Sequence, residues 1–221
     1  MNSKVAIRRL ATGVPGLDAV LGGGLPELSF NLITGPPGSG KTTLAHQIMF
    51  AMATRERPAL FFSVLGEPAL KMLRYQQQFS FFDLARINES VRFVNLGDDV
   101  ATGSFDQVLA RITEEVEASS PALVFVDSFR SVTLEAQQQP QGTLTQQQFI
   151  QQLGIQLSGW QATTFLVGEY LSVSDPHPIF TMADGLKRSA QVVLPAHIKQ
   201  IRLLSLMPAR DGPVVHPRRT H

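Results

Sequence analysis

The chain has 221 residues, of which 43% are apolar, and this size and composition are typical of one globular α/β domain with a substantial core. Lys and Arg total 19 against 18 for Asp and Glu, so the net charge of +1 gives no strong attraction for nucleic acid or anionic membranes, and the absence of cysteine excludes disulfides and thiolate chemistry. No apolar run approaches the roughly 20 residues of a membrane-spanning helix, and no apolar signal segment follows the basic N-terminus. We therefore expect one cytoplasmic domain over 1–221, with its core over about 9–207 and a flexible tail over 208–221, and no membrane partner.

The first half of the chain alternates short apolar runs with segments of helical periodicity. Gly and Pro punctuate residues 12–30 and predict loops around one brief helix at most. Apolar runs of bounded length predict strands at 31–34, 58–65 and 91–96. Helical spacing predicts helices at 41–52, from Glu67-Pro68 to about 78, and at 105–118.

The second half continues this alternation after a buried strand at 121–127. The Gln-rich segment 135–160 resembles a low-complexity linker, but its second half carries an apolar stripe at helical spacing, which predicts a helix there and an open loop only at 137–142. Further strands are predicted at 162–170, 191–194 and 199–206. Repeated strand-helix units predict a mostly parallel sheet covered on both faces, a three-layer α/β fold.

The segment from Gly35 to Thr42 matches the phosphate-loop (Walker A) pattern G-x-x-x-x-G-K-[ST], between a predicted strand and a predicted helix. Glycines allow backbone N–H groups to surround phosphate oxygens, and the helix N-terminus adds positive potential. Lys41 would reach the β and γ phosphates of ATP, and Thr42 would offer its hydroxyl to Mg²⁺. The candidate nucleotide-binding residues are Gly35, Pro36, Pro37, Gly38, Ser39, Gly40, Lys41, Thr42 and Thr43.

Three carboxylates lie at or just after the ends of predicted strands and are candidates for metal binding or catalysis. Asp127 ends an apolar strand, as the Walker B carboxylate that holds Mg²⁺ does, with Ser128 beside it; the alternative is a solvated strand terminus. Glu67 is the candidate base that activates water, with Lys41 as the other catalytic residue, although Glu67 also suits a helix start. Glu169 is the next candidate, able to sense the γ-phosphate, and its alternative is a polar strand terminus.

The remaining histidines and aromatic residues suggest packing rather than chemistry. His46 lies within the helix after the phosphate loop and is interpreted as a packed or half-exposed residue, not a ligand. Tyr75 and the run Phe79 to Phe82 are interpreted as core packing and not as a platform for stacking bases.

Four motifs together resemble the KaiC-like branch of the RecA-type P-loop ATPases. They are TGVPGLD (12–18), GGGLP (22–26), the phosphate loop, and Val126-Asp127-Ser128. The resemblance covers about residues 9–185, and the two N-terminal motifs are more specific than the phosphate loop alone. It implies a RecA-like fold and a hexameric ring that holds nucleotide at its subunit interfaces. Protein signalling partners are a further expectation.

Two positions depart from that family pattern. The family has two adjacent glutamates after the second strand, whereas Glu67 stands alone. A Lys-x-Arg pair on a late strand reaches the neighbouring subunit's γ-phosphate in the family, and Ser205 and Met207 occupy the aligned positions here. We therefore expect ATP to bind readily and to be hydrolysed slowly, unless Arg202 or Arg210 supplies the cation in another register.

Three functions are compatible with this site. The leading hypothesis is a regulatory or signalling ATPase. A RecA- or RadA-like DNA-binding ATPase is the second, but residues 171–178 contain no Lys or Arg, so we expect no nucleic-acid partner. The third is a Ser/Thr autokinase that uses the same Mg²⁺-ATP site, because the sequence does not distinguish water from a hydroxyl as the phosphate acceptor.

Overall fold

The computed structural model describes residues 7–64, 74–102, 104–129, 144–169, 185–193 and 199–206, the last two ranges by their backbone. Within these residues a sheet of seven strands forms the middle layer, in the order β5-β4-β6-β7-β3-β8-β9. Its strands are β3 (Phe30–Thr34), β4 (Ala59–Ser63), β5 (Val91–Asn95), β6 (Leu123–Asp127), β7 (Thr163–Gly168), β8 (Gly185–Val193) and β9 (Lys199–Leu206). Neighbouring strands are parallel except for β9, which is antiparallel to β8. The mostly parallel sheet predicted from the sequence is confirmed.

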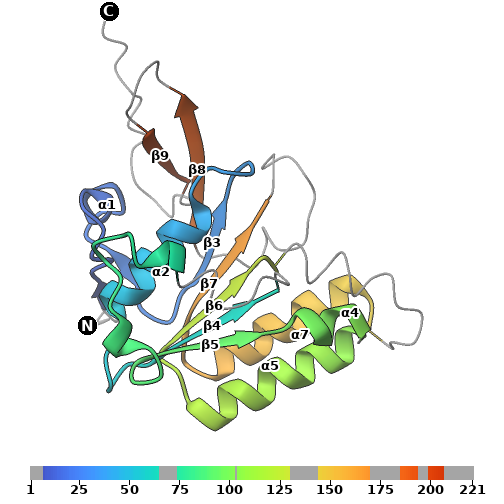
Figure 1. Ribbon diagram of the computed structural model, residues 1–221. Helices are drawn as coiled ribbons and strands as arrows, with labels where there is room; N and C mark the ends of the chain where they lie inside the picture. Colours follow the sequence, from blue (N-terminus) through green and yellow to red (C-terminus); the bar gives the residue numbers. More distant parts are fainter. Residues whose placement is uncertain are drawn as a thin grey trace, which may run out of the picture.

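Helices cover both faces of this sheet, as Figure 1 shows. The helices given in full by the described residues are α1 (Leu17–Val20), α2 (Lys41–Met52), the short 3₁₀ helix η1 (Leu84–Arg86), α4 (Gly97–Thr102), α5 (Phe105–Ser119) and α7 (Gln146–Gly159). Successive residues of a strand point to opposite faces, so Phe61 packs in the cluster with α2 while Leu60 and Phe62 pack in the cluster with α5 and α7. Because both faces are buried, the central strands are mostly apolar, and the expected three-layer fold is confirmed.

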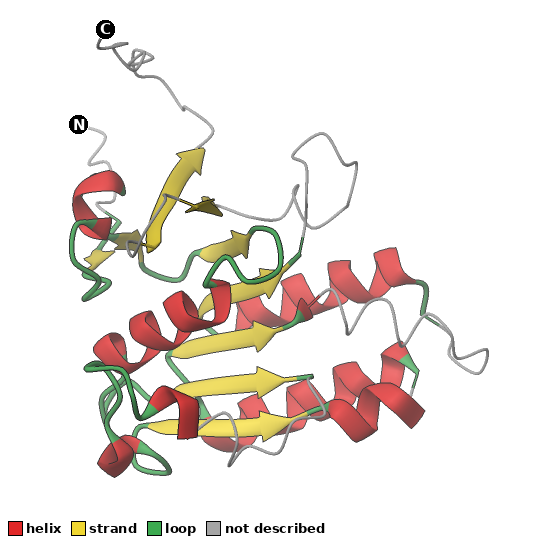
Figure 2. Cartoon of the chain, turned by 45° about the horizontal axis from the view of Figure 1, so that its top comes forward, coloured by secondary structure: helices red, strands yellow, loops and turns green. Residues whose placement is uncertain are grey.

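The Gln-rich segment forms a helix where its apolar stripe predicts one. α7 runs beside α5 on one face of the sheet (Figures 1 and 2), and Phe149, Leu153 and Leu157 are buried against the sheet. At its start the Thr145 hydroxyl accepts a hydrogen bond from the Gln148 amide at 3.3 Å, which satisfies a backbone N–H that a helix leaves unpaired. The open loop predicted at 137–142 lies outside the described residues.

The N-terminal motif packs against the far end of the phosphate-loop helix. The Asp18 carboxylate accepts hydrogen bonds from the backbone and hydroxyl of Thr12, at 2.9 and 2.7 Å. Gly13 has φ +67°, and a Cβ there would come within 2.3 Å of the Ala51 side chain in α2. Only glycine permits this approach, so the motif holds the N-terminal segment on α2. This N-terminal segment also contains a small antiparallel strand pair, β1 (Arg9–Leu10) with β2 (Leu25–Pro26).

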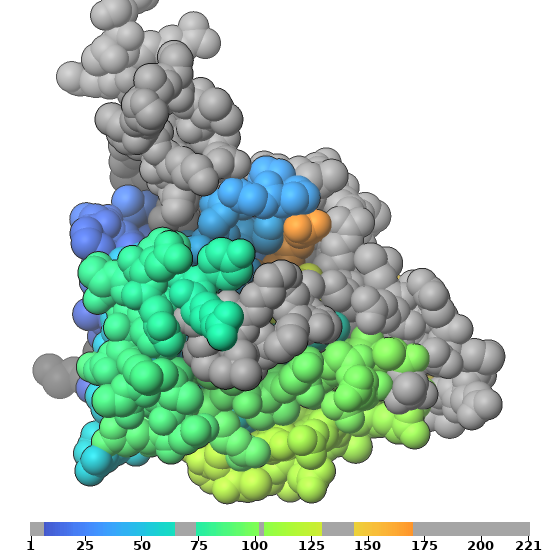
Figure 3. Space-filling view, viewed as in Figure 1, coloured from blue at the N-terminus to red at the C-terminus, as the bar shows by residue number. Residues whose placement is uncertain are grey.

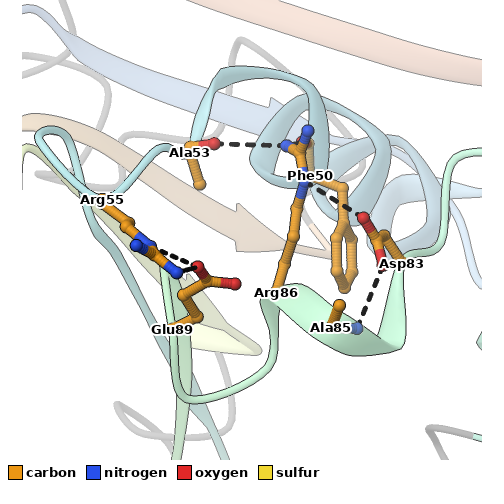
Figure 4. A network of polar contacts seen from close by, with 7 residues as sticks. All are labelled: Phe50, Ala53, Arg55, Asp83, Ala85, Arg86 and Glu89. Carbon is orange, nitrogen blue, oxygen red and sulfur yellow. Dashed lines mark hydrogen bonds and ion pairs between the residues drawn. The ribbon is translucent and has the colours of Figure 1, made fainter.

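A polar network closes the C-terminal end of α2 (Figure 4). The Arg86 guanidinium donates hydrogen bonds to the carbonyl oxygens of Phe50 and, at 3.2 Å, Ala53, and it lies 3.5 Å from the Asp83 carboxylate. The last carbonyls of a helix lack partners within the helix and carry its negative dipole end, so a cation there is stabilising.

Several details differ from the sequence prediction. The short polar helix α4 and the β1-β2 pair were not predicted, because neither carries a long periodic pattern. β8 begins at Gly185 rather than 191, since the charged Lys187 and Arg188 interrupt its apolar pattern. Phe81 and Phe82 do pack against the core, but Tyr75 and Phe79 are 61% and 43% exposed, so the prediction of core packing was wrong for these two. None of the helices described is long and apolar enough to cross a membrane.

Candidate nucleotide-binding site

The phosphate loop connects β3 to α2, as its motif requires. β3 ends at Thr34, α2 begins at Lys41, and the six residues between them form the turn. Gly38 and Gly40 have φ values of +71° and +86°, a conformation that side chains disfavour, which accounts for glycine at these positions. Because the first backbone N–H groups of a helix lack internal partners, the start of α2 and the glycine turn form an anion-binding concavity.

The order of strands brings the phosphate loop, Asp127 and Glu169 to one edge of the sheet. β7 lies between β3 and β6 and pairs in parallel with both. The carboxyl ends of all three strands therefore meet, and ligands of open α/β sheets bind at this edge. Asp127 is the last residue of β6, and Glu169 directly follows β7. In the space-filling view the orange end of β7 reaches the surface beside the blue phosphate-loop segment (Figure 3).

Lys41, Thr42, Asp127 and Glu169 lie together at this edge. The Thr42 hydroxyl donates a hydrogen bond of 2.6 Å to the Asp127 carboxylate. The Lys41 ammonium donates to the carbonyl oxygen of Pro36 at 2.9 Å and lies 3.8 Å from the Glu169 carboxylate. The sequence placed Lys41, Thr42 and Asp127 in one site, whereas it did not indicate that Glu169 pairs with Lys41.

Burial shifts the pKa values of Asp127 and Lys41 in opposite directions. The Asp127 side chain is 95% buried, which raises its pKa to about 6, although the Thr42 hydrogen bond and the Lys41 charge oppose that rise. Burial lowers the pKa of Lys41, while the Glu169 and Asp127 carboxylates oppose the decrease. The Lys41 and Asp127 side chains are thus largely shielded from water, whereas the Glu169 side chain beside Lys41 is 43% exposed.

Thr42 and Asp127 fit the requirements of a magnesium site. Mg²⁺ prefers oxygen ligands and takes only one or two from the protein, since waters and substrate phosphates supply the rest. A hydroxyl and a carboxylate oxygen 2.6 Å apart match this pattern. Among the described residues no group of three or more His, Cys, Asp or Glu side chains could hold a metal ion.

Other predicted site residues are placed only in part. Glu67 lies outside the described residues, as do Met207 and Arg210. Ser128 follows Asp127 at the end of β6. The backbone of β9 pairs Ser205 with Lys187 and Arg202 with Ala190 on β8. The predicted absence of a cation for the neighbouring subunit, with Arg202 or Arg210 as the alternative donor, therefore stays a prediction.

Comparison with known proteins places these features in a family. The model of the family described as "ATPase: KaiC" matches residues 10–183. A UPF0273 protein of Methanopyrus kandleri is 41% identical over 64 residues, which are 29% of this chain and 25% of that protein. A DNA repair protein RadA of Brucella abortus is 29% identical over 183 residues, 80% of this chain and 37% of that protein. The chain thus spans well under half the length of these curated relatives.

Structural comparison gives the same fold. The crystal structure of a KaiC-like protein from Pyrococcus horikoshii superposes with a TM-score of 0.72 and 23% sequence identity, covering 94% of this chain and 92% of that one. The family model spans the N-terminal motifs, the phosphate loop and both strand-end carboxylates. The chain belongs to the KaiC family of RecA-like P-loop ATPases.

Proposed function

We propose that this protein binds ATP with Mg²⁺ at the phosphate loop and hydrolyses it in a regulatory or signalling role. The observation that carries the proposal is the hydrogen bond from Thr42 to Asp127 beside the buried ammonium of Lys41. This arrangement brings a phosphate-binding cation and two oxygen ligands for Mg²⁺ to the start of one helix, which is what Mg²⁺-ATP chemistry needs. Membership of an ATPase family supports it.

Each residue has a role that follows from its chemistry. The backbone N–H groups of residues 35–43 bind phosphate oxygens, and Lys41 balances the charge of the β and γ phosphates. Thr42 and Asp127 hold Mg²⁺, which when bound neutralises charge that develops during phosphoryl transfer. Glu67 orients or deprotonates the attacking water. We propose slow hydrolysis, because neither Ser205 nor Met207 can donate positive charge across a subunit interface.

Assembly and partners form part of the same proposal. We propose a hexameric ring with nucleotide at its interfaces, in which the nucleotide state changes the affinity for protein partners. A DNA-binding ATPase is the second candidate, because the similarity to a protein named DNA repair protein RadA covers 80% of this chain. The net charge of +1 argues against it, since DNA binding depends on neutralising phosphates.

One set of measurements tests these roles together. Titration calorimetry should detect Mg²⁺-ATP binding to the wild type, and Lys41→Ala should weaken it severely without loss of folding. Arg8→Ala is the control, because it also removes one cation. The Arg8 side chain is 68% exposed and forms an ion pair with Glu27, not with the residues of the site. Phosphate release, self-phosphorylation and molar mass by light scattering then distinguish hydrolase, autokinase and ring. Equal ATP affinity in folded Lys41→Ala and the wild type would refute the assignment.

A further inference from the structure

The Lys41 ammonium is shared between two acceptors of the protein itself. One is the carbonyl oxygen of Pro36 at 2.9 Å, within the phosphate loop, and the other is the Glu169 carboxylate at 3.8 Å. The lysine of this motif must direct the same N–H groups at the β and γ phosphates of a nucleotide. Glu169 and the terminal phosphates therefore compete for one cation.

The sheet holds Glu169 at this place. β7 pairs with a strand on each side along its length, up to Gly168 opposite Thr34 and Val167 opposite Asp127. The backbone before Glu169 cannot withdraw from the loop without breaking these pairings. The negative charge stays close to any phosphate that Lys41 binds, although its 43% exposure allows the side chain to turn and water to screen part of the charge.

The two carboxylates near Lys41 differ in what they can contribute. Asp127 accepts a hydrogen bond from the magnesium-binding candidate Thr42, so its charge would be balanced by the metal ion. Glu169 pairs instead with the phosphate-binding lysine. Removing the Glu169 charge should therefore change phosphate affinity without removing a metal ligand.

We propose that Glu169 is a specificity-determining residue that competes with the terminal phosphate for Lys41, so that it weakens ATP binding and lowers the preference for ATP over ADP. This inference rests on the proposed function. The γ-phosphate adds negative charge at the position that Lys41 serves, so ATP meets more repulsion from Glu169 than ADP does. The affinities of the site for ATP and ADP then differ less than they would without the Glu169 charge.

The test is Glu169→Gln, which keeps the size of the side chain and removes its charge. Two unit charges about 4 Å apart interact by about 1 kcal/mol in water, and an exposed ion pair contributes no more than that, so the affinity for ATP should rise by up to about fivefold. The affinity for ADP should rise less, which increases the ratio of the two dissociation constants. In steady-state phosphate release KM should fall while kcat changes little, because the proposed function assigns the role of base to Glu67 and not to Glu169.

Glu117→Gln is the matched control, since it makes the same change of net charge at an exposed position of α5, on the opposite face of the sheet. Calorimetry with Mg²⁺-ATP and Mg²⁺-ADP on all three proteins should show a change for Glu169→Gln alone. Unchanged or weaker ATP binding by folded Glu169→Gln, with normal binding by the wild type, overturns this inference and leaves the proposed function standing. A large loss of kcat would overturn it too, because Glu169 would then act in the chemical step. If the wild type binds no ATP, both fail.

Discussion

The wild type should lose stability in acid because of His46, and His46→Leu should not show this part of the loss. His46 lies in α2 and is completely buried, with its ring 4.5 Å from that of Phe61 and 5.8 Å from that of Phe93. Neither ring nitrogen has a hydrogen-bond partner in the described part of the chain. The Gln76 side chain is near enough to raise the pKa slightly, but burial dominates and lowers the pKa to about 4. The buried ring therefore stays neutral until the pH is low.

The sign and size of the effect follow from this pKa. The unfolded chain gains a proton on His46 below its ordinary pKa of 6.5, whereas the folded protein resists until about 4. The stability that the neutral His46 ring contributes to the folded state is therefore fully present above pH 6.5 and is lost as the pH falls toward 4. Between pH 7.5 and 5.0 the linkage relation gives a loss of about 2 kcal/mol. Leucine cannot titrate, so the variant escapes this loss.

Protonation of Asp127 changes the stability in the opposite direction. In a pH series of the wild type alone it would mask the contribution of His46. The pKa of Asp127 is raised from 3.8 to about 6, so protonation favours the folded state as the pH falls through that window. The comparison must therefore be a difference between wild type and His46→Leu, in which the Asp127 contribution cancels. Urea unfolding at pH 7.5 and 5.0 measures this difference, and Met49→Leu, another buried site in α2, is the control.

We expect the variant to gain about 2 kcal/mol relative to the wild type on going from pH 7.5 to 5.0, with no such gain for Met49→Leu. At neutral pH His46→Leu should be neutral or stabilising, because an unpaired buried polar group costs about 1–3 kcal/mol. A difference that is the same at both pH values would refute the reasoning. It would mean that His46 titrates normally in the folded protein.

Two further predictions concern other residues. Arg86→Ala should lower the free energy of unfolding by about 1–2 kcal/mol, measured by urea unfolding, because the terminal carbonyls of Phe50 and Ala53 lose a charged donor (Figure 4). An unchanged midpoint would show that water replaces the guanidinium without cost. Glu67→Gln should retain ATP binding and lower phosphate release about 100-fold, as expected for loss of a general base. If it hydrolyses ATP like the wild type, Glu67 is only a helix-start residue.

The local parts of the site could be predicted from the sequence because their geometry is encoded locally. The helix predicted at 41–52 is α2 with the same ends, and the strand predicted at 121–127 ends on Asp127 as β6 does. Glycines at 38 and 40 indicate positive φ, and the next residue begins the helix. The proximity of Thr42 and Asp127 was also expected, since both were predicted to hold the same Mg²⁺, although their direct hydrogen bond was not.

The contact of Glu169 with Lys41 could not be predicted in the same way, because it depends on which strand lies beside β3. Sequence periodicity marks the end of each strand but carries no information on the order of strands, which non-local packing decides. Periodicity alone leaves any strand as the neighbour of β3. Because β7 lies between β3 and β6, Glu169, which follows β7, lies beside the phosphate loop. This polar residue at a strand end is therefore an ion-pair partner of Lys41. The local sequence marks Glu169 as a candidate near the γ-phosphate, but only the strand order places it in contact with Lys41.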